Sequence, residues 1–205
     1  MTQPKVAVFD LDGTITRRDT LIPFLRRLSV PRLLWGIVRA FPWMVAGLWN
    51  RSRRDDAKKA VISASLGGKY VQEIEEAAGI FAERLLSTGL NAPVIERVTK
   101  HQDSGHRVAI ASATPSVLVT PIAEALGIHD VIASELEISD GVYTGRLAGA
   151  NNRSEEKQRR VLATLGAPPD YAYGNLPDDR ALLDAAVSAY VIANETITPF
   201  TQRSA

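Results

Sequence analysis

The stretch KVAVFDLDGTITRRDT, residues 5 to 20, decides the fold of this chain. Residues 5–9 form an apolar run rich in β-branched and aromatic side chains, which predicts a buried parallel strand. Asp10 and Asp12 follow at the carboxyl end of this strand, where open α/β sheets bind ligands. Two neighbouring carboxylates repel each other and lose solvation unless a cation or a proton compensates them. Because Mg2+ prefers hard oxygen ligands together with phosphate oxygens and water, the pattern indicates a magnesium site.

The next two residues also suit a ligand site. Gly13 lets the backbone turn tightly and approach a ligand closely, and Thr14 adds a hydroxyl. The alternative is a β-turn whose acidic side chains face water, since Asp-Gly is a common turn signal. A strand followed by five specified residues favours the ligand site over such a turn.

The composition is that of a globular chain without cysteine chemistry. The 205 residues suffice for one large domain or for a core with an insertion, and 45% of them are hydrophobic, enough for a sizeable core. The absence of cysteine excludes disulfides and thiolate metal sites. The first residues, MTQPK, lack the apolar segment of a signal peptide and lead directly into the predicted strand. We therefore expect a cytoplasmic protein.

The formal net charge of +1 conceals a strongly basic block. Between Asp19 and Asp55 there is no acidic residue but there are seven arginines, which leaves 17 basic and 23 acidic residues for the rest of the chain. All three tryptophans fall in the same block. Such a basic block on an acidic body indicates an anionic partner.

The same block bears on membrane contact. Arg32, Arg39 and two prolines interrupt its apolar run, so it does not predict a membrane-spanning helix. One prediction is a peripheral membrane contact through residues 30–54, with arginines at the level of the lipid headgroups and tryptophans at the boundary. The alternative is a helical pair packed inside the protein or against a second copy. Nucleic acid is not expected as a partner, because the block is apolar between its arginines.

The remaining pattern predicts an α/β core with an inserted helical cap. Residues 17–90 predict helices, and beyond them strands alternate with helices, as in a doubly wound parallel sheet with right-handed crossovers. We assign residues 1–16 and 91–205 to a Rossmann-like core and residues 17–90 to the cap. Asp140-Gly141 predicts a small β-hairpin, and residues 198–205 predict a frayed tail.

Three further groups are expected at the edge of the sheet that carries the two aspartates. Ser112 ends a predicted strand, and its hydroxyl with the backbone N–H groups from Ala113 onward could cradle a phosphate, although a helix cap is the alternative. Lys157 could neutralise a phosphoryl group, although a lone lysine on a helix is more commonly a surface residue. Asn175 and Asp179 follow a third strand and could complete the Mg2+ site, with a solvated turn as the alternative.

The order and spacing of these pieces resemble the phosphoserine-phosphatase-like branch, subfamily IB, of the haloacid dehalogenase-like hydrolase superfamily. The resemblance covers nearly the whole chain and implies that family's α/β core and cap. It is carried by DLDGT at 10–14, HQDSGH at 101–106 before VAIASAT at 108–114, the hairpin with TGR at 144–146, EEK at 155–157, and YGN at 173–175 with DD at 178–179.

The resemblance implies roles for four residues. In that family the first aspartate of DxDGT attacks phosphorus and the second is the general acid and base. Asp10 would therefore be the nucleophile, forming an aspartyl-phosphate, and Asp12 the proton donor and acceptor. Ser112 would bind the transferring phosphate, and Lys157 would stabilise both the phosphate and the intermediate.

The resemblance also implies that Mg2+ is held by Asp10, Asp12, Asn175 and Asp179. One departure matters, because the family usually has an aspartate at the position of Asn175. An asparagine offers a carbonyl oxygen but no charge, so Mg2+ should bind more weakly. Asp179 matches the second aspartate of that motif, and either it or Asp178 could compensate. A non-catalytic phosphate-binding protein is the alternative that rests on this departure.

Substrate choice is expected to lie with the cap. Asp19 stands where phosphoserine enzymes of this branch carry an acidic residue for the substrate amino group. Arg54 and Lys58, four residues apart on a predicted helix, could reach a second anionic group. The expected substrate contacts are Thr14, Asp19, Arg54, Ser112, Ala113 and Lys157.

The basic, tryptophan-rich block suggests that the substrate is a lipid phosphate. Some members of this branch resemble phosphatidylglycerophosphate phosphatases with similarly apolar caps. We therefore predict a Mg2+-dependent phosphomonoester phosphatase acting on such a lipid, associated with the membrane from the cytoplasm. The alternative substrate is phosphoserine or another small metabolite.

Overall fold

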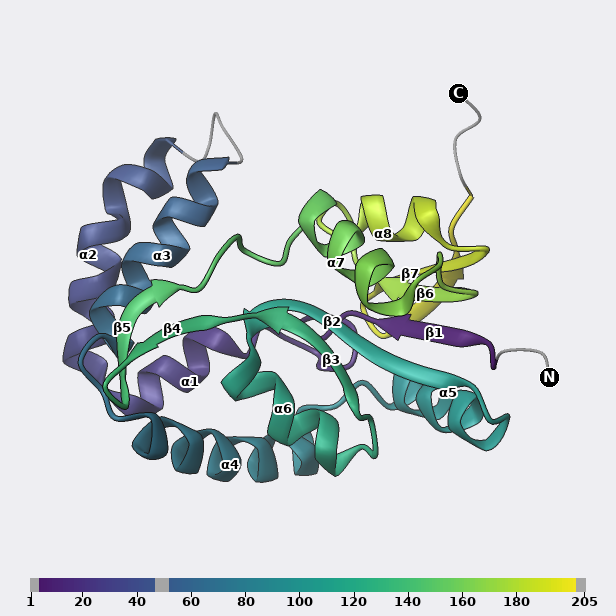
Figure 1. The fold of residues 1–205 in the computed structure, drawn as a ribbon, viewed down its shortest axis with the longest axis horizontal. Coiled ribbons are helices and arrows are strands. Elements are labelled where there is room, and N and C mark those ends of the chain that lie inside the picture. The colour runs from purple at the N-terminus through teal and green to yellow at the C-terminus, as the bar shows by residue number, and fades with distance from the viewer. Residues whose placement is uncertain (1–3, 47–51, 202–205) are drawn as a thin grey trace.

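A six-stranded sheet forms the centre of the molecule, with helices on both of its faces (Figure 1). The structure is a computed structural model, which describes residues 4–46 and 52–201. The strands of this sheet are β1 (Val6–Phe9), β2 (Arg107–Pro115), β3 (Asp130–Ser134), β6 (Tyr171–Gly174), β7 (Ser188–Ala193) and β8 (Thr196–Pro199). They are arranged in the order β3-β2-β1-β6-β7-β8, with all neighbours parallel except β7 and β8. The predicted doubly wound α/β fold is thereby confirmed.

Most of the helices lie between β1 and β2 in the sequence. They are α1 (Leu21–Leu28), α2 (Val30–Ala46), α3 (Ser52–Leu66), α4 (Val71–Thr88) and α5 (Ala92–Asp103). Those after β2 are α6 (Ser116–Ala125), α7 (Glu155–Leu165) and α8 (Arg180–Ala185). A separate antiparallel hairpin pairs β4 (Leu136–Ser139) with β5 (Val142–Leu147). Its turn has positive φ at both Asp140 and Gly141, as the sequence pattern of a tight hairpin requires.

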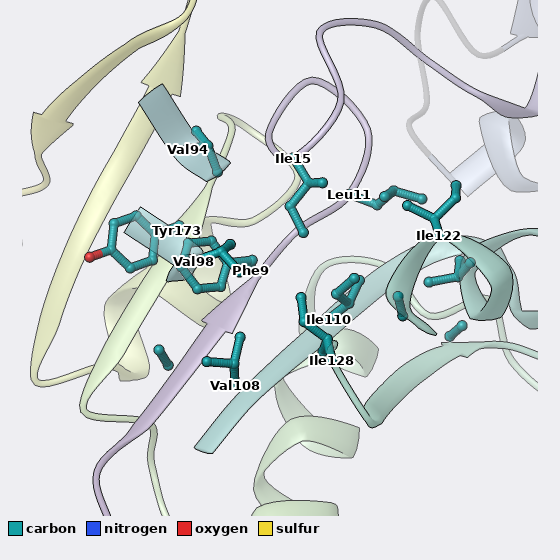
Figure 2. Packing of buried hydrophobic residues seen from close by; sticks show 14 of the residues in the cluster. Phe9, Leu11, Ile15, Val94, Val98, Val108, Ile110, Ile122, Ile128 and Tyr173 are labelled. Carbon is teal, nitrogen blue, oxygen red and sulfur yellow. The ribbon is translucent and has the colours of Figure 1, made fainter. Parts of the chain in front are cut away.

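The apolar run of β1 is explained by burial on both faces of the sheet. Phe9 points toward α5 and α6, where its ring stacks on that of Tyr173 at 4.4 Å between centroids (Figure 2). Val8 points to the opposite face, which α7 and α8 cover. Because successive side chains of a strand alternate between faces, a strand covered on both sides must be apolar throughout.

The helices α1 to α4 enclose a second cluster of buried side chains. Phe24 of α1 meets Phe81 of α4 edge to face, with ring centroids 5.6 Å apart. Tyr143 of β5 and Leu118 of α6 belong to the same cluster, so later segments of the chain share this core. The assignment of residues 17–90 to a separate cap stays a prediction.

The end of the described chain departs from expectation. The frayed tail predicted from residue 198 onward was wrong for its first residues, because Thr198 pairs with Val191 in the β7–β8 ladder. The alternating polar and apolar residues Thr196-Ile197-Thr198 are typical of a strand. The prediction of a frayed tail gave more weight to their position near the C-terminus. Among the helices of residues 4–46 and 52–201, none is long and apolar enough to cross a membrane.

Candidate active site

The carboxyl ends of three adjacent strands bring the candidate residues together. Asp10 follows β1, Ser112 lies near the end of β2 and Asn175 follows β6. They border a cleft of about 470 Å3, which residues of α1 and α3 also line. The predicted site residues that line it are Asp10, Asp12, Asp19, Ser112, Ala113, Lys157, Asn175 and Asp179.

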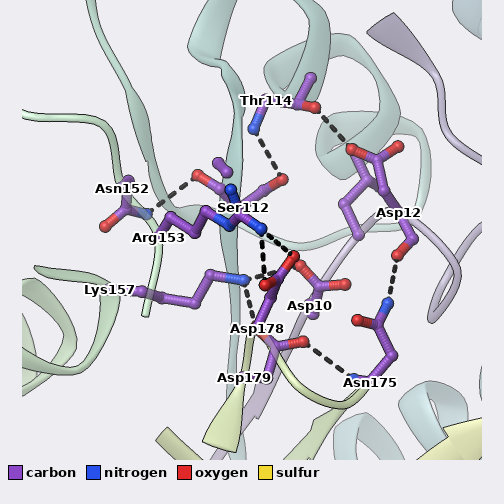
Figure 3. Close-up of polar contacts among 12 residues, drawn as sticks. Asp10, Asp12, Ser112, Thr114, Asn152, Arg153, Lys157, Asn175, Asp178 and Asp179 are labelled. Atoms are coloured by element: carbon purple, nitrogen blue, oxygen red, sulfur yellow. Dashed lines mark hydrogen bonds and ion pairs between the residues drawn. The ribbon is translucent and has the colours of Figure 1, made fainter. Parts of the chain in front are cut away.

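Lys157 bridges two buried carboxylates at the base of this cleft (Figure 3). Its Nζ donates to Asp10 Oδ1 at 2.8 Å and to Asp179 Oδ1 at 2.6 Å, and all three residues are at most 5% exposed. Burial disfavours the ammonium, but the two carboxylates outweigh that effect and raise the pKa of Lys157. Burial and the charge of Asp179 raise the pKa of Asp10 well above its usual range, and Lys157 offsets only part of that shift. Lys157 is therefore a buried charged residue and not a surface lysine of its helix.

The charges and donors of this group suit a hard divalent cation. When both are ionised, Asp10 and Asp179 carry two negative charges against the one positive charge of Lys157, so a cation would lower the cost of burying them. Asn175 Nδ2 donates to the Asp12 carbonyl at 2.7 Å, while its side-chain oxygen points toward Asp10 (Figure 3). The carboxylate, carbonyl and amide oxygens that meet here are the donor types that Mg2+ prefers.

Carboxylates alone do not complete a metal site. The described residues contain no group of three or more His, Cys, Asp or Glu side chains arranged to hold a metal ion. Both oxygens of Asp179 are engaged, one by Lys157 and the other by the backbone N–H of Asn175 at 2.9 Å. A cation would therefore depend on the Asp12 carbonyl and the Asn175 amide oxygen in addition to Asp10.

Close packing holds the two loops that carry these donors. Gly13 has a φ of +76°, and a Cβ added there would lie 2.9 Å from Asn175 Nδ2. A Cβ on Gly174 would lie 2.7 Å from both Cβ and Oδ2 of Asp179. Both positions thus require glycine, because a larger residue would push the loops apart.

The Asp12 carboxylate lies apart from the lysine-bridged pair and is held by two threonines. Its Oδ1 accepts hydrogen bonds from the backbone N–H and the hydroxyl of Thr20 at 2.8 and 2.7 Å. Its Oδ2 accepts one from the Thr114 hydroxyl at 2.5 Å. Burial and the negative charge of Asp19 raise the pKa of Asp12, and the threonine hydrogen bonds oppose this shift. The carboxylate is thus fixed in direction and protonates more readily than a solvated one.

Ser112 is buried within β2, which continues to Pro115. The helix α6 begins only at Ser116, so the backbone N–H groups after Ser112 belong to an extended strand and not to a helix start. Ser112 Oγ accepts the backbone N–H of Thr114 at 3.0 Å. The Asn152 side chain donates to the Ser112 carbonyl at 2.9 Å and to the Ile132 carbonyl at 2.6 Å, and thereby joins the ends of β2 and β3.

A polar network connects α3 to the core of the molecule. Lys58 Nζ donates to the Ala113 carbonyl and to Asn151 Oδ1, the latter at 2.8 Å. Asn151 Nδ2 in turn donates to Asp55 Oδ1 at 2.7 Å. Burial lowers the pKa of Lys58 to about 8, although Asp12 and Asp55 favour its charged form.

Arg153 extends this network to the loop after β6. Its Nη2 donates to both carboxylate oxygens of Asp178, at 2.7 and 2.8 Å, and its Nη1 lies 3.5 Å from Asp55 Oδ1. Asp178, one of the two aspartates expected to compensate for Asn175, is thus paired with arginine. Sequence reasoning missed Asn151, Asn152 and Arg153, because no local pattern marks them and their partners lie far along the chain.

Three predicted substrate contacts have different surroundings. Asp19 lines the cleft, and its Oδ1 accepts the backbone N–H of Ile22 at 3.2 Å. Thr14 is fully buried, and its hydroxyl has no hydrogen-bond partner within the described part of the chain. Its neighbour Gly13, and not Thr14, is among the residues that line the cleft. The Arg54 side chain lies outside the described residues.

The sequence matches a known family and named relatives. The model of the haloacid dehalogenase-like hydrolase family matches residues 7–184. Protein CicA of Caulobacter vibrioides is 32% identical over 189 residues, which span 90% of this chain and 84% of CicA. A probable phosphatase of Mycobacterium tuberculosis is 25% identical, over 91% of this chain and 68% of its own. The phosphoserine phosphatase SerB1 of the same organism is 26% identical, over 70% of this chain and 48% of its own.

Solved structures share the fold. A protein of unknown function from Bordetella pertussis Tohama I aligns with a TM-score of 0.74 and 26% identity, over 92% of this chain and 89% of that one. A substrate-bound phosphoserine phosphatase aligns with a TM-score of 0.64, over 92% of this chain and 86% of that one. At 18% identity, this second likeness shows a common fold.

Proposed function

The chain belongs to the haloacid dehalogenase-like hydrolase family. It is a phosphatase of that family, like its probable-phosphatase relative, and on this premise we propose how it works. It is a Mg2+-dependent phosphomonoester hydrolase that acts through an aspartyl-phosphate on Asp10. The observation that carries the proposal is the arrangement of Asp10 against Lys157 and Asp179, with Asp12 held separately at the same cleft.

The first step forms a covalent bond between enzyme and phosphate. Lys157 anchors Oδ1 of Asp10 and so fixes the direction of its carboxylate. The other carboxylate oxygen attacks phosphorus, and the bond between phosphorus and the substrate oxygen breaks. Asp12 donates its proton to the leaving alkoxide. The raised pKa of Asp12 suits this role, because it increases the protonated fraction near neutral pH.

The second step releases phosphate with the same two carboxylates. Asp12, now ionised, takes a proton from a water molecule whose oxygen attacks phosphorus. The bond between phosphorus and Asp10 breaks, so that both carboxyl groups return to their starting states. The contacts from Thr20 and Thr114 keep the Asp12 carboxylate in one orientation during both proton transfers.

The phosphoryl oxygens need positive charge and hydrogen-bond donors throughout. Lys157 supplies a charge that burial does not remove, and we assign the Ser112 hydroxyl and the Ala113 N–H as neutral donors. Asp10, the Asp12 carbonyl and Asn175 would hold Mg2+, and Asp179 would position Lys157 and the Asn175 backbone or act as a further ligand. When bound, Mg2+ would neutralise charge on the transferring phosphoryl group.

For the substrate we propose a lipid phosphomonoester such as phosphatidylglycerophosphate, at a membrane reached from the cytoplasm. The apolar residues Leu21, Ile22, Ala57 and Val61 line the cleft on the side of α1 and α3, where a substrate's organic group would lie. Phosphoserine or another small phosphomonoester is the alternative, since Asp19 also lines the cleft and could pair with an amino group.

Phosphate release with and without Mg2+ tests the proposal. The substrates are phosphoserine, sugar phosphates, a chromogenic aryl phosphate, and phosphatidylglycerophosphate in mixed micelles, and the Asp10→Asn protein serves as the blank. Mg2+-dependent release that the variant lacks supports the mechanism, and preference for the lipid supports the substrate. Absence of release from every substrate would favour a phosphate-binding protein without catalysis.

A further inference from the structure

The helix α2 exposes a continuous apolar face to solvent. Its outward side chains recur every three or four residues, as on one face of a helix, and each is 46 to 63% exposed. We call this set the outer face of α2, and it consists of Leu34, Trp35, Val38, Phe41, Met44 and Val45. Eight of the 14 large hydrophobic residues that are exposed in the described chain lie on this one helix. A gathering of that kind marks an interaction surface.

The opposite face of α2 is already packed against α3. Leu33, Gly36 and Ala40 are buried there. The contact at Gly36 is close, because an added Cβ would lie 3.1 Å from Val61 Cα and 3.2 Å from Ala64 Cβ. The outer face is therefore not the inner packing surface of the helix, and the protein's own core does not explain its apolar character.

The helices α1 and α2 together carry four exposed arginines and no acidic residue. Arg26 and Arg27 are exposed in the last turn of α1, and Arg32 and Arg39 are exposed on α2. No aspartate or glutamate occurs between residues 20 and 54. Arg32 also donates to the Gly67 carbonyl at 3.2 Å, and Arg39 borders a groove that Asp56 shares. The net positive charge of the two helices favours an occupant that offers apolar groups beside negative charges.

We infer that the outer face of α2 docks onto the surface of a bilayer that contains anionic phospholipids. Apolar and tryptophan side chains can enter the boundary between headgroups and acyl chains while the arginines pair with lipid phosphates. A second copy of this chain fits less well, because a symmetric contact would join two helix pairs that each carry four arginines and no acidic residue. A nucleic acid would leave the apolar side chains without partners.

Docking of this kind places the catalytic cleft beside the lipid surface. In Figure 1, α2 lies on the outer side of α3, at the end of the molecule away from α8. Ala57, Lys58 and Val61 of α3 line the cleft, so one helix separates the docked face from the site. The inference deepens the proposed function by naming the surface that meets the membrane, and its test is separate because vesicle binding requires no turnover.

Co-sedimentation of the wild-type chain with vesicles tests this inference. Vesicles of phosphatidylcholine mixed with phosphatidylglycerol are compared with vesicles of phosphatidylcholine alone. We expect binding to the anionic vesicles only, weakened by salt and accompanied by a blue shift of tryptophan fluorescence. Absence of binding to anionic vesicles would overturn the inference, whatever the enzymatic activity of the same sample.

Two sets of variants locate the binding surface. Val38→Glu with Phe41→Glu should weaken binding at least about tenfold, whereas Ile80→Glu with Val187→Glu adds the same charges at exposed apolar positions elsewhere and should change it little. Changing Arg26, Arg27 and Arg39 to Gln should cost about fivefold for each arginine at low salt. The control for charge changes the exposed Arg84, Arg97 and Arg159 to Gln.

The remaining outcomes identify a different occupant. Equal losses in the α2 variants and their controls would contradict the assignment of the face. A wild-type dimer in sedimentation velocity that Val38→Glu with Phe41→Glu dissociates would assign the face to a second copy and overturn the bilayer. The thermal unfolding midpoint of every variant is compared with that of the wild type, to separate loss of vesicle binding from loss of the fold.

Discussion

The Asn175 side chain donates a 2.7 Å hydrogen bond to the Asp12 carbonyl, an oxygen that we propose as a ligand for Mg2+. The same amide presents its oxygen toward Asp10, so one uncharged group faces both of its neighbours in the proposed metal site. An aspartate in its place would bring a further negative charge but no donor for the carbonyl. We therefore expect residue 175 to limit the affinity of the proposed site for Mg2+.

Asn175→Asp should tighten Mg2+ binding by about tenfold, because affinity for the cation rises with the number of charged ligands. Isothermal titration calorimetry with Mg2+ measures this without substrate. Asn175→Ala, which removes both the hydrogen bond and the oxygen, should bind Mg2+ more weakly than the wild type. An unchanged dissociation constant in both variants would show that residue 175 does not touch the metal.

Asp10→Asn should stabilise the metal-free protein near neutral pH. Because folding raises the pKa of Asp10 above its ordinary 3.8, its contribution to stability is present at low pH and is lost as the pH rises through the folded-state pKa. The free energy of unfolding of the variant, relative to that of the wild type, should therefore increase as the pH rises from acid to neutral. The expected gain is about 1.4 kcal/mol for each unit by which folding raises the pKa.

Urea denaturation at several pH values provides this measurement. Asp103→Asn, at an exposed position of α5, is the matched control. A difference between Asp10→Asn and the wild type that stays constant from acid to neutral pH would refute the account of the buried charges.

Thr114→Val should slow catalysis with little effect on folding. The Thr114 hydroxyl fixes Asp12 Oδ2 and opposes the rise of its pKa, so its removal should raise that pKa further. We expect kcat to fall about tenfold and the pH optimum to move upward, since Asp12 must ionise to activate water. The pH–rate profile is the measurement, with Thr99→Val on the exposed side of α5 as control. A lower kcat with an unshifted profile would mean that Thr114 does not act through Asp12.

Arg153→Gln should loosen the connection between α3 and the core. Because Arg153 pairs with Asp178 and Asp55, we expect faster amide hydrogen exchange in α3 and a KM raised about tenfold, with a smaller change in kcat. Arg159→Gln removes an exposed ion pair of α7 and serves as control. A double-mutant cycle with Asp55→Asn tests whether the two residues interact. If the effects of the two single substitutions sum to the effect of the double variant, Asp55 and Arg153 are not coupled, which would contradict this account.

The fold followed from sequence because its local and global signals agree. The apolar run of β1 must be buried on both faces, which a parallel sheet covered by helices provides. Asp140-Gly141 predicts the separate β4–β5 hairpin from local sequence alone. The course of the chain near residue 198 was harder to predict. A short strand at the edge of the sheet gains its stability from the neighbouring β7, which a reading of residues 198–205 alone does not include.

The site was only partly predictable for a related reason. Asp10 and Asp12 follow a strand, so their location could be inferred from the strand itself. Lys157 stands in a helix among polar residues, and only the tertiary structure shows that it is buried between Asp10 and Asp179. Arg153 is even harder to predict from sequence, because its ion-pair partners Asp55 and Asp178 are 98 and 25 residues away.

The most direct test of the catalytic account is a search for phosphate on Asp10. The protein is mixed with Mg2+ and a phosphomonoester that it hydrolyses, quenched in acid within one turnover, digested, and analysed by mass spectrometry. We predict a phosphoryl group on the peptide that contains Asp10, absent from Asp10→Asn and labile to hydroxylamine. Turnover without this modification, or substantial turnover by Asp10→Asn, would contradict the account.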